Sequence, residues 1–290
     1  FWQVLRSAGH VVHLASLGGD DVADSPESAL DGGGKMREFS PDAMLNVDAL
    51  RQWAMMLKPD AIVGCGTTLP GAAAGRLNDI APVWIDLAGD PIAEVQVKAR
   101  AYPDEPYETL LHHVWKLTQT CLRKADRLSG VSRAHCHALI GMLGLLGRLN
   151  RETADAPMIH NLPIGPPPRL TPTSQIRLSR LRGVKCPDDA FLVAWSGSYN
   201  TWIDADLLFE GLSLAIERIP TLHYVSTGGG SAGYNEGIYA QFAERVNSSP
   251  LADRFHLLGW LDRDEAEAIH AQCDIGLNVD RWCYEGILGA

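Results

Sequence analysis

The sequence has no long hydrophobic run. No window approaches the ~18 uninterrupted apolar residues that indicate a membrane-spanning helix, and no basic stretch followed by an apolar run marks a signal peptide. Hydrophobic residues make up 46% of the 290 positions but are dispersed, which is typical of a globular chain long enough for two domains. We therefore expect a soluble, cytoplasmic protein.

Positive charge is also scarce. The chain has 25 lysines and arginines against 35 aspartates and glutamates, which gives a net charge of -10. Proteins that bind nucleic acid usually carry a basic footprint, so we expect no nucleic-acid partner. A small phosphorylated ligand stays open, because local backbone dipoles can bind it.

Several reactive-site motifs are missing. The six cysteines include no C-x-x-C pair and are typical of free thiols in a reducing compartment. Neither a G-x-S-x-G elbow nor a GxxxxGK[ST] loop occurs, which argues against a hydrolase of that type and a phosphate-loop NTPase. The cluster His135, Cys136 and His137 has no carboxylate at helical spacing, so we interpret it as helix surface and expect no metal.

Short apolar runs alternate with helical patterns along the whole chain. Because such runs are typical of parallel strands covered by helices on both faces, the alternation predicts two doubly wound α/β domains in succession. Ligands of such domains bind at the carboxyl ends of the strands. Expected strands are 10–16, 61–66, 82–89, 127–132, 157–163, 191–197, 222–228, 255–260 and 275–280, and expected helices are 44–57, 70–79, 91–100, 105–125, 133–147, 203–219, 234–247 and 262–272.

A proline-rich stretch divides this pattern. We predict an N-terminal domain over 1–165, a linker over 166–186 and a second domain over 187–290. The first segment reads as the end of a helix that feeds a strand, and the last strand has no covering helix after it. We therefore expect both domains to be incomplete parts of a longer protein, and we read the glycine-rich stretch 30–35 as a flexible loop.

Two turns of the second domain are candidate binding sites. Gly197 ends a strand, and Ser198 follows it toward a helix. The free N–H groups at the start of that helix could bind a phosphate. Alternatively, Thr201 or Asp204 simply caps the helix. The next turn matches G-x-G-x-x-G at Gly228, Gly230 and Gly233. That motif indicates dinucleotide binding when it occupies the first strand-helix turn of a domain. Here it occupies the second turn, so we do not favour a dinucleotide site.

Two acids follow a strand of the first domain. Asp86 and Asp90 lie at the end of 82–89, just before a helix that Pro91 opens. One of them is expected to cap that helix. The other could hydrogen-bond a polyol or act as a base.

Taken together, these pieces resemble the glycosyltransferases of the GT-B fold, and within them the retaining family 4. The resemblance rests on "ADRLSGVSRAHCHAL", "FLVAWSGSYNTW", "LHYVSTGGG" and, most specifically, "FHLLGWLDRDEAEAIHAQCDIGLNVDRWCYEG". Nearly the whole chain is covered. The resemblance implies two Rossmann-like domains that face a cleft.

The resemblance also implies roles for individual residues. Glu285 matches the first glutamate of an E-x7-E pair that reaches the donor sugar, and its second member falls beyond residue 290. Gly259 and Trp260 match the segment beside the nucleotide base, although Trp260 could instead be core packing. The turns near the diphosphate correspond to Gly197, Ser198, Gly228, Gly229 and Gly230.

One departure from the family concerns charge. Members usually place an arginine and a lysine near the first turn of the donor domain, and this chain has neither there. We predict that Arg281 or Arg263 supplies the cation, unless both are ordinary surface arginines. Asp90 is our candidate on the acceptor side.

The expected function is therefore transfer of a sugar from a nucleoside-diphosphate sugar, with retention, to an unidentified glycan, lipid or small molecule. No cofactor is expected beyond this donor substrate, and peripheral association with a membrane stays open. Two alternatives remain: a nucleotide-sugar epimerase of the same fold, and a non-catalytic homologue that binds a nucleotide or a partner protein.

Overall fold

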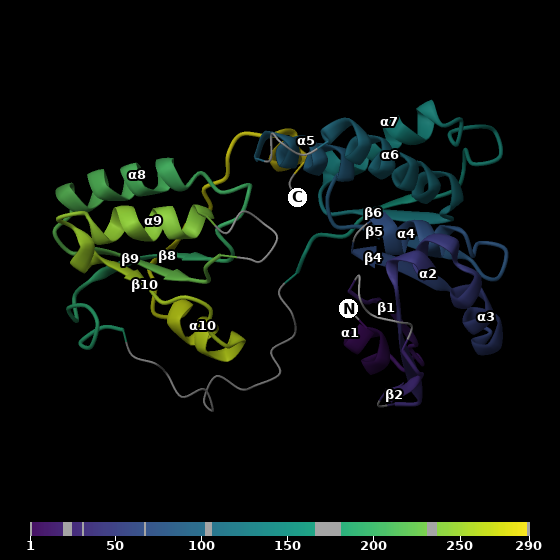
Figure 1. Ribbon diagram of the computed structural model, residues 1–290, viewed down its shortest axis with the longest axis horizontal. Coiled ribbons are helices and arrows are strands. Elements are labelled where there is room, and N and C mark those ends of the chain that lie inside the picture. The colour runs from purple at the N-terminus through teal and green to yellow at the C-terminus, as the bar shows by residue number, and fades with distance from the viewer. Residues whose placement is uncertain are drawn as a thin grey trace. The chain divides into compact units, whose positions relative to one another are not determined.

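A computed structural model of the chain describes residues 2–19, 25–30, 32–66, 68–101, 106–165, 181–230 and 237–288. The chain forms two compact units (Figure 1). Unit 1 comprises Phe1–Gln96, Asp104–Ile164 and Ile287–Ala290, and unit 2 comprises Val97–Pro103 and Gly165–Gly286.

Unit 1 is built on a parallel four-stranded sheet. Its strands lie in the order β4 (Ile62–Gly66), β5 (Val83–Leu87), β6 (Arg127–Gly130) and β7 (Ile159–Asn161). Buried side chains of the strands pack with those of α4 (Thr68–Gly75), α6 (Tyr107–Lys124) and α7 (Arg133–Leu145) in one core. Further helices of this unit are α1 (Trp2–Ser7), α2 (Pro41–Asn46) and α3 (Asp48–Leu57), while α5 (Pro91–Ala101) begins in unit 1 and its residues from Val97 on are assigned to unit 2.

A second, smaller sheet in unit 1 was not foreseen. It has the order β1 (Leu14–Leu17), β3 (Gly34–Phe39) and β2 (Ser28–Leu30), with β3 parallel to β1 and antiparallel to β2. The flexible loop predicted over 30–35 is therefore wrong for Gly34 and Lys35, which begin β3. Gly32 and Gly33 have φ of +80° and +82°, so these glycines turn the chain between two paired strands instead of loosening it.

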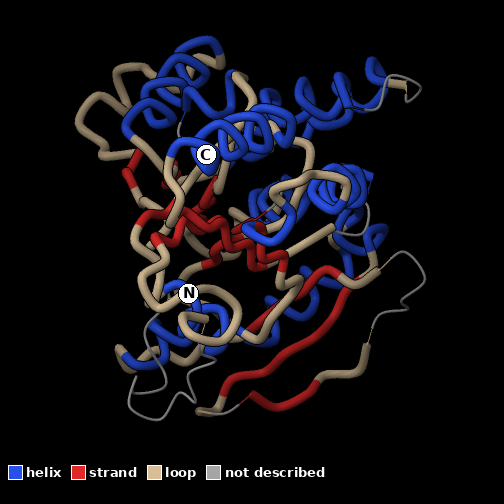
Figure 2. The backbone as a smooth tube through the Cα atoms, turned by 90° about the vertical axis from the view of Figure 1, so that its left-hand side faces the viewer, coloured by secondary structure: helices blue, strands red, loops and turns tan. Residues whose placement is uncertain are grey.

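Unit 2 has the doubly wound form. Its parallel strands lie in the order β10 (Phe255–Leu257), β9 (Leu222–Thr227), β8 (Phe191–Ser196) and β11 (Ile275–Gly276). α8 (Ala205–Arg218) and α9 (Gly237–Asn247) pack on one face, and α10 (Arg263–His270) packs on the other. Figure 2 shows strands of the chain running between layers of helices. η2 (Ala252–Arg254) and α11 (Tyr284–Leu288) complete the elements.

The mixed α/β fold with two Rossmann-like units that the alternation predicts is confirmed. Each expected helix and strand has a counterpart, although most differ by a few residues at their ends and the strands expected over 10–16, 157–163 and 255–260 are reduced to Leu14–Leu17, Ile159–Asn161 and Phe255–Leu257. Two further elements differ from the expectation. The helix expected over 44–57 is divided at Val47, whose φ of 61° is left-handed, and the strand expected over 275–280 pairs only at Ile275 and Gly276. Within the described residues, no helix has the length and apolarity to cross a bilayer.

Candidate functional site

Three glycine turns meet at the carboxyl ends of neighbouring strands in unit 2. Gly197, Gly228 and Gly259 follow β8, β9 and β10, and their φ angles are +138°, +117° and +71°. The Gly228 N–H donates to the Gly259 carbonyl at 2.6 Å, and the Gly197 N–H donates to the Thr227 carbonyl at 3.0 Å. The turns therefore form one continuous backbone surface.

Only glycine fits the centre of this surface. A Cβ atom at Gly228 would lie 1.9 Å from the carbonyl oxygen of Gly197, well inside van der Waals contact. At Gly229, by contrast, the nearest atom to an added Cβ would be Trp260 Nε1 at 3.5 Å, an ordinary contact. Close approach of two backbone turns, not flexibility, explains the glycine at 228.

Trp260 lies over the second turn. Its Nε1 donates to the carbonyl of Gly230 at 2.9 Å, and 63% of the residue is exposed. The core-packing alternative for this side chain is therefore wrong. The indole is therefore largely open to solvent, within the segment predicted to lie beside the base.

The first turn leads into a helix that is already capped. Asp204 accepts from the backbone N–H of Leu207 at 3.1 Å and is the N-cap of α8, so the capping alternative is confirmed. Ser198 accepts from Asn200 Nδ2 at 3.1 Å. A carboxylate occupies the start of α8, and the N–H groups of Gly197 and Tyr199 already donate to the carbonyls of Thr227 and Gly229. The donors that this turn offers an anion are therefore the amides of Ser198 and Asn200, rather than the helix terminus.

A polar network lies behind the turns. Thr227 Oγ1 donates to Ser196 Oγ at 3.0 Å and lies 2.7 Å from His270 Nε2, which places an α10 side chain against the ends of β8 and β9. Burial lowers the pKa of His270, so this imidazole is neutral at pH 7 and supplies no cation. The sequence reasoning missed it, because nothing distinguishes a helical histidine that faces a sheet from one that faces water.

Glu285 reaches the first turn. It lies in the first turn of α11, is only 8% exposed, and accepts a hydrogen bond from Trp202 Nε1. Trp202 in turn donates its backbone N–H to Asn200 Oδ1 at 3.0 Å. This chain of contacts joins the predicted sugar-binding glutamate to the turn that carries Gly197 and Ser198.

The two candidate cations have other neighbours. Arg281 donates from Nε to the carbonyl of Ile203 at 3.1 Å and lines a cavity of about 460 Å³ between α8 and α9. Arg263 forms an ion pair of 2.9 Å with Glu267, four residues along α10. The cation that neutralises a diphosphate therefore stays a prediction for Arg281.

The two acids of unit 1 have different roles. Asp90 is 4% exposed, and its Oδ1 accepts from the backbone N–H groups of Ile92 at 3.0 Å and Ala93 at 2.9 Å. It therefore caps α5. Asp86 is half-buried and accepts from the hydroxyl of Ser129, which itself accepts from Trp84 Nε1 at 2.8 Å.

A buried histidine lies close to these acids. His135 has no exposed surface, and neither ring nitrogen has a hydrogen-bond partner among the described residues. Burial lowers its pKa, while Asp90 and Asp86 raise it more weakly. The expectation that 135–137 form helix surface is wrong for His135 and Cys136, which are buried against β6, and holds for exposed His137.

Comparisons with known proteins establish the fold. No protein-family model and no curated protein matches the sequence. Among solved structures, an α,α-trehalose-phosphate synthase (UDP-forming) from Burkholderia vietnamiensis is similar over 95% of this chain and 71% of its own, with a TM-score of 0.66 and 14% identity.

Two further structures agree. A trehalose-6-phosphate synthase studied for glycosyl transfer with retention covers 97% of this chain and 74% of its own, with a TM-score of 0.63 and 15% identity. An E. coli trehalose-6-phosphate enzyme bound with UDP-2-fluoro glucose covers 91% and 70%, with a TM-score of 0.56 and 14% identity. The chain thus has the GT-B fold of these proteins.

Proposed function

We propose that this chain is a glycosyltransferase that takes a sugar from a nucleoside-diphosphate sugar and transfers it with retention of anomeric configuration. The GT-B fold supports the reaction class, since the similar structures include a UDP-forming synthase and an enzyme studied for transfer with retention. UDP is accordingly the nucleotide to test first.

The observation that carries the proposal is the meeting of the three glycine turns. Gly197, Gly228 and Gly259 bring bare backbone together at the carboxyl edge of the unit 2 sheet, where ligands of doubly wound folds bind. The N–H groups of Gly197 and Gly228 are used between the turns, so the donors we assign to a diphosphate are neighbouring amides of the same turns, those of Ser198 and Gly229. The exposed face of Trp260, beside the second turn, offers a stacking surface for the base.

Glu285 is the residue we assign to the sugar. Its carboxylate is held by Trp202 within the same part of unit 2 as the first glycine turn, so it is positioned to accept hydrogen bonds from sugar hydroxyls. Transfer breaks the bond between the anomeric carbon and the diphosphate oxygen, and the new bond forms to an acceptor hydroxyl on the same face. Stabilising the leaving diphosphate and orienting the oxocarbenium-like sugar are the main tasks of the protein.

The acceptor side is assigned to unit 1. Since Asp90 uses Oδ1 to cap α5, Asp86 at the end of β5 is the acid better placed to receive an acceptor hydroxyl. Ser129 and Trp84 fix its carboxylate from one side. The acceptor itself is a glycan, a lipid or a small molecule.

One observation favours a second candidate, a nucleotide-binding protein without turnover. The turn from Gly197 to Thr201 contains no lysine or arginine, and Arg281 donates to a backbone carbonyl. A diphosphate leaving group without a nearby cation is harder to expel. Substrate turnover, rather than binding, separates the two candidates.

The first test is a thermal-shift screen of the chain with UDP, GDP, ADP, dTDP and NAD. A ligand at ~100 times its dissociation constant adds about 2.7 kcal/mol to stability, and we expect one nucleoside diphosphate, UDP first, to give the shift. Trp260→Ala should weaken that binding roughly tenfold, by removal of about 1–3 kcal/mol of stacking, while Trp115→Ala in unit 1 should not. A shift with NAD alone would overturn the proposal.

A second test separates the enzyme from the binder. UDP-glucose is supplied with candidate acceptors, and release of UDP is followed for the native chain and for Glu285→Gln. We expect about 100-fold slower release in the variant with unchanged UDP affinity, since the lost contact acts on the sugar. UDP binding without release from either protein would favour the binder, and an epimerised donor formed without any acceptor would favour the epimerase.

A further inference from the structure

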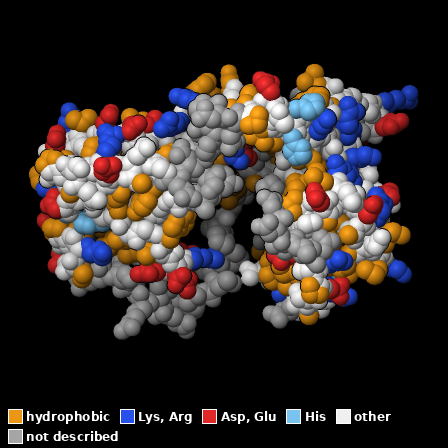
Figure 3. Space-filling view, viewed as in Figure 1, with side chains coloured by type: hydrophobic (Ala, Val, Ile, Leu, Met, Phe, Trp, Pro, Cys, Tyr) orange, Lys and Arg blue, Asp and Glu red, His pale blue; other side chains and the backbone are white. Residues whose placement is uncertain are grey.

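The helices α6 and α7 carry an unusual charge. Between Tyr107 and Arg151 there are seven lysines and arginines but only two acids, Glu108 and Asp126, although the chain as a whole has a net charge of -10. Asp126 uses its carboxylate to accept the backbone N–H of Val83 at 2.8 Å. Figure 3 shows lysine, arginine and histidine side chains gathered over these two helices.

The exposed face of α6 carries three cations and two histidines. Lys116, Arg123 and Lys124 are exposed, as are His112 and His113, and Glu108 in the first turn is the only acid of the helix. Trp115 lies within this arc and is 49% exposed. An amphipathic helix normally mixes both signs on its polar face, so a face of one sign indicates a partner of opposite charge.

Exposed apolar side chains continue the same surface on α7. Leu145 is 91% exposed, Ile140 is 43% exposed, and Leu149 is 50% exposed and packs near Gly144. Exposure of a leucine side chain to water is unfavourable, because apolar surface is stabilised only when it is buried. Exposed apolar groups that lie beside cations are characteristic of surfaces that bind another protein or a membrane.

Arg148 fixes the two helix ends to each other. Its guanidinium donates to the carbonyls of Leu122 at 2.9 Å and Ala125 at 3.0 Å, which satisfies the carboxyl end of α6. Arg123 and Lys124 at that end are thereby held beside the residues that follow α7, where Leu149 and exposed Arg151 lie. Cations and apolar side chains therefore lie close together at this end of the two helices, where Glu152 is a neighbouring exposed acid. We call the exposed residues of α6, α7 and the segment 146–151 the α6–α7 surface.

We propose that the α6–α7 surface docks the protein on an anionic phospholipid membrane. Lysine and arginine side chains would lie among the phosphates, while Leu145, Leu149 and Trp115 enter the headgroup region. This pairing of apolar insertion with positive charge is what distinguishes a lipid surface from a purely polyanionic partner. The chain as a whole has a net charge of -10, which an anionic membrane repels, so we place the membrane against this basic surface.

The inference is independent of the proposed glycosyl transfer and is tested by flotation with vesicles. The full chain is mixed at low salt with vesicles of phosphatidylcholine alone or with phosphatidylglycerol added. We expect flotation only with the anionic vesicles. Arg123→Gln/Lys124→Gln should lower the partition coefficient roughly 25-fold, since each cation near an anionic surface is worth about fivefold.

Two further variants complete the experiment. Leu145→Ser, which alters a side chain outside the core, should also reduce flotation, whereas Lys185→Gln/Arg218→Gln, which removes two exposed cations from unit 2, should not. Unchanged circular dichroism and melting show that each variant is folded. Equal binding to neutral vesicles, no flotation at all, or retention on a heparin column without flotation would each overturn the proposal.

Discussion

At the scale of single residues, the sharpest distinction is between two carboxylates of unit 1. Asp86 lies near the carboxyl end of β5 and Asp90 follows that strand, yet Asp90 caps α5 through two backbone N–H groups and Asp86 is bound by Ser129. A cap requires only an acceptor oxygen, whereas general-base chemistry requires a carboxylate. Substitutions that separate these two needs will assign the roles.

Asp90→Asn should leave both stability and turnover nearly unchanged, because the amide oxygen can still accept from Ile92 and Ala93. Asp90→Ala should lower the free energy of unfolding by about 1 kcal/mol, the usual cost of a lost N-cap. Asp86→Asn should slow transfer at least tenfold without an effect on nucleotide affinity. Chemical denaturation and UDP release measure these quantities, and loss of turnover in Asp90→Asn would return the catalytic role to Asp90.

The sequence could not assign residues whose role depends on the direction in which the side chain points. The sequence did not separate the two acids, since both lie near the end of one strand and precede one helix, and only the hydrogen bonds of the folded chain distinguish them. His135 and His270 were missed for the same reason, because a histidine buried under a helix has no sequence signature. The glycines of the turns could be predicted, since strands of a parallel sheet end at a common edge and glycine there indicates close backbone approach.

At the scale of elements, the turns after β8 and β9 depend on a contact between two backbones. Gly228→Ala would place Cβ 1.9 Å from the Gly197 oxygen at a φ of +117°. We expect a loss of at least about 3 kcal/mol from unit 2, since steric overlap adds to backbone strain. Gly229→Ala is the matched control, because its nearest contact of 3.5 Å is ordinary, and it should change stability by less than about 1 kcal/mol. Similar melting of both variants would contradict this account of the turn.

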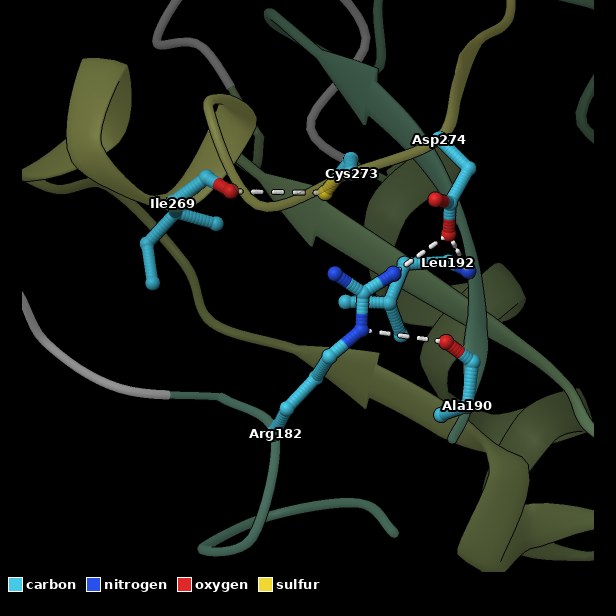
Figure 4. Close-up of polar contacts among 6 residues, drawn as sticks. All are labelled: Arg182, Ala190, Leu192, Ile269, Cys273 and Asp274. Atoms are coloured by element: carbon cyan, nitrogen blue, oxygen red, sulfur yellow. Dashed lines mark hydrogen bonds and ion pairs between the residues drawn. The ribbon is translucent and has the colours of Figure 1, made fainter. Parts of the chain in front are cut away.

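A second element-scale contact joins the segment before β8 to the strand β11. Asp274 Oδ2 accepts from Arg182 at 2.5 Å and from the backbone N–H of Leu192 at 2.7 Å, while Arg182 Nε donates to the carbonyl of Ala190 at 3.1 Å (Figure 4). Cys273, the preceding residue, donates to the carbonyl of Ile269 at the end of α10. One carboxylate thus connects three segments of unit 2.

Asp274→Ala should therefore cost about 2 kcal/mol, because it leaves a backbone donor and a guanidinium without their acceptor. The exposed pair Arg263 and Glu267 on α10 provides the comparison, and Glu267→Ala should cost about 0.5 kcal/mol or less. Urea denaturation measures both. Equal effects would mean that Asp274 contributes no more than a surface ion pair.

The elements also show where sequence patterns fall short. Short apolar runs separated by helical patterns predicted the two main sheets, because strands covered on both faces are apolar throughout. The helix expected over 44–57 was divided because Val47 adopts a left-handed conformation that a β-branched residue rarely takes. The small sheet was missed because its strands are short and its glycines suggested a loop, although Gly34 pairs with Leu30.

At the scale of the whole molecule, the histidines determine how stability varies with mild acid. His223 and His256 are stacked with ring centroids 5.3 Å apart and share a hydrogen bond of 3.0 Å between Nδ1 and Nε2. Burial, the largest cause, lowers both pKa values, and that of His256 falls to about 4, helped by His223 and Lys185. Burial lowers the pKa of His135 in unit 1 and of His270 in unit 2 in the same way.

These pKa shifts fix the direction in which the free energy of unfolding changes with pH. Between about pH 6.5 and pH 4 the unfolded chain binds protons that the folded chain does not, so stability present above pH 6.5 is lost as the pH falls. Ordinary carboxylates titrate mostly below pH 5, which leaves the interval from pH 6.5 to pH 5 to the histidines. We expect His256 to account for about 1 kcal/mol there, after an allowance for partial exposure to solvent.

Differential scanning calorimetry at pH 7.5, 6 and 5 measures this dependence for the transition of unit 2, which nucleotide binding identifies. The midpoint should fall with pH in the native chain and fall less in His256→Asn, because the variant has lost one of the groups that the unfolded state protonates. Arg218→Gln, which replaces an exposed cation of unit 2 that does not titrate in this pH range, should leave the slope unchanged. A pH-independent midpoint across this range would mean that the buried histidines of unit 2 are as accessible to protons in the folded state as in the unfolded chain.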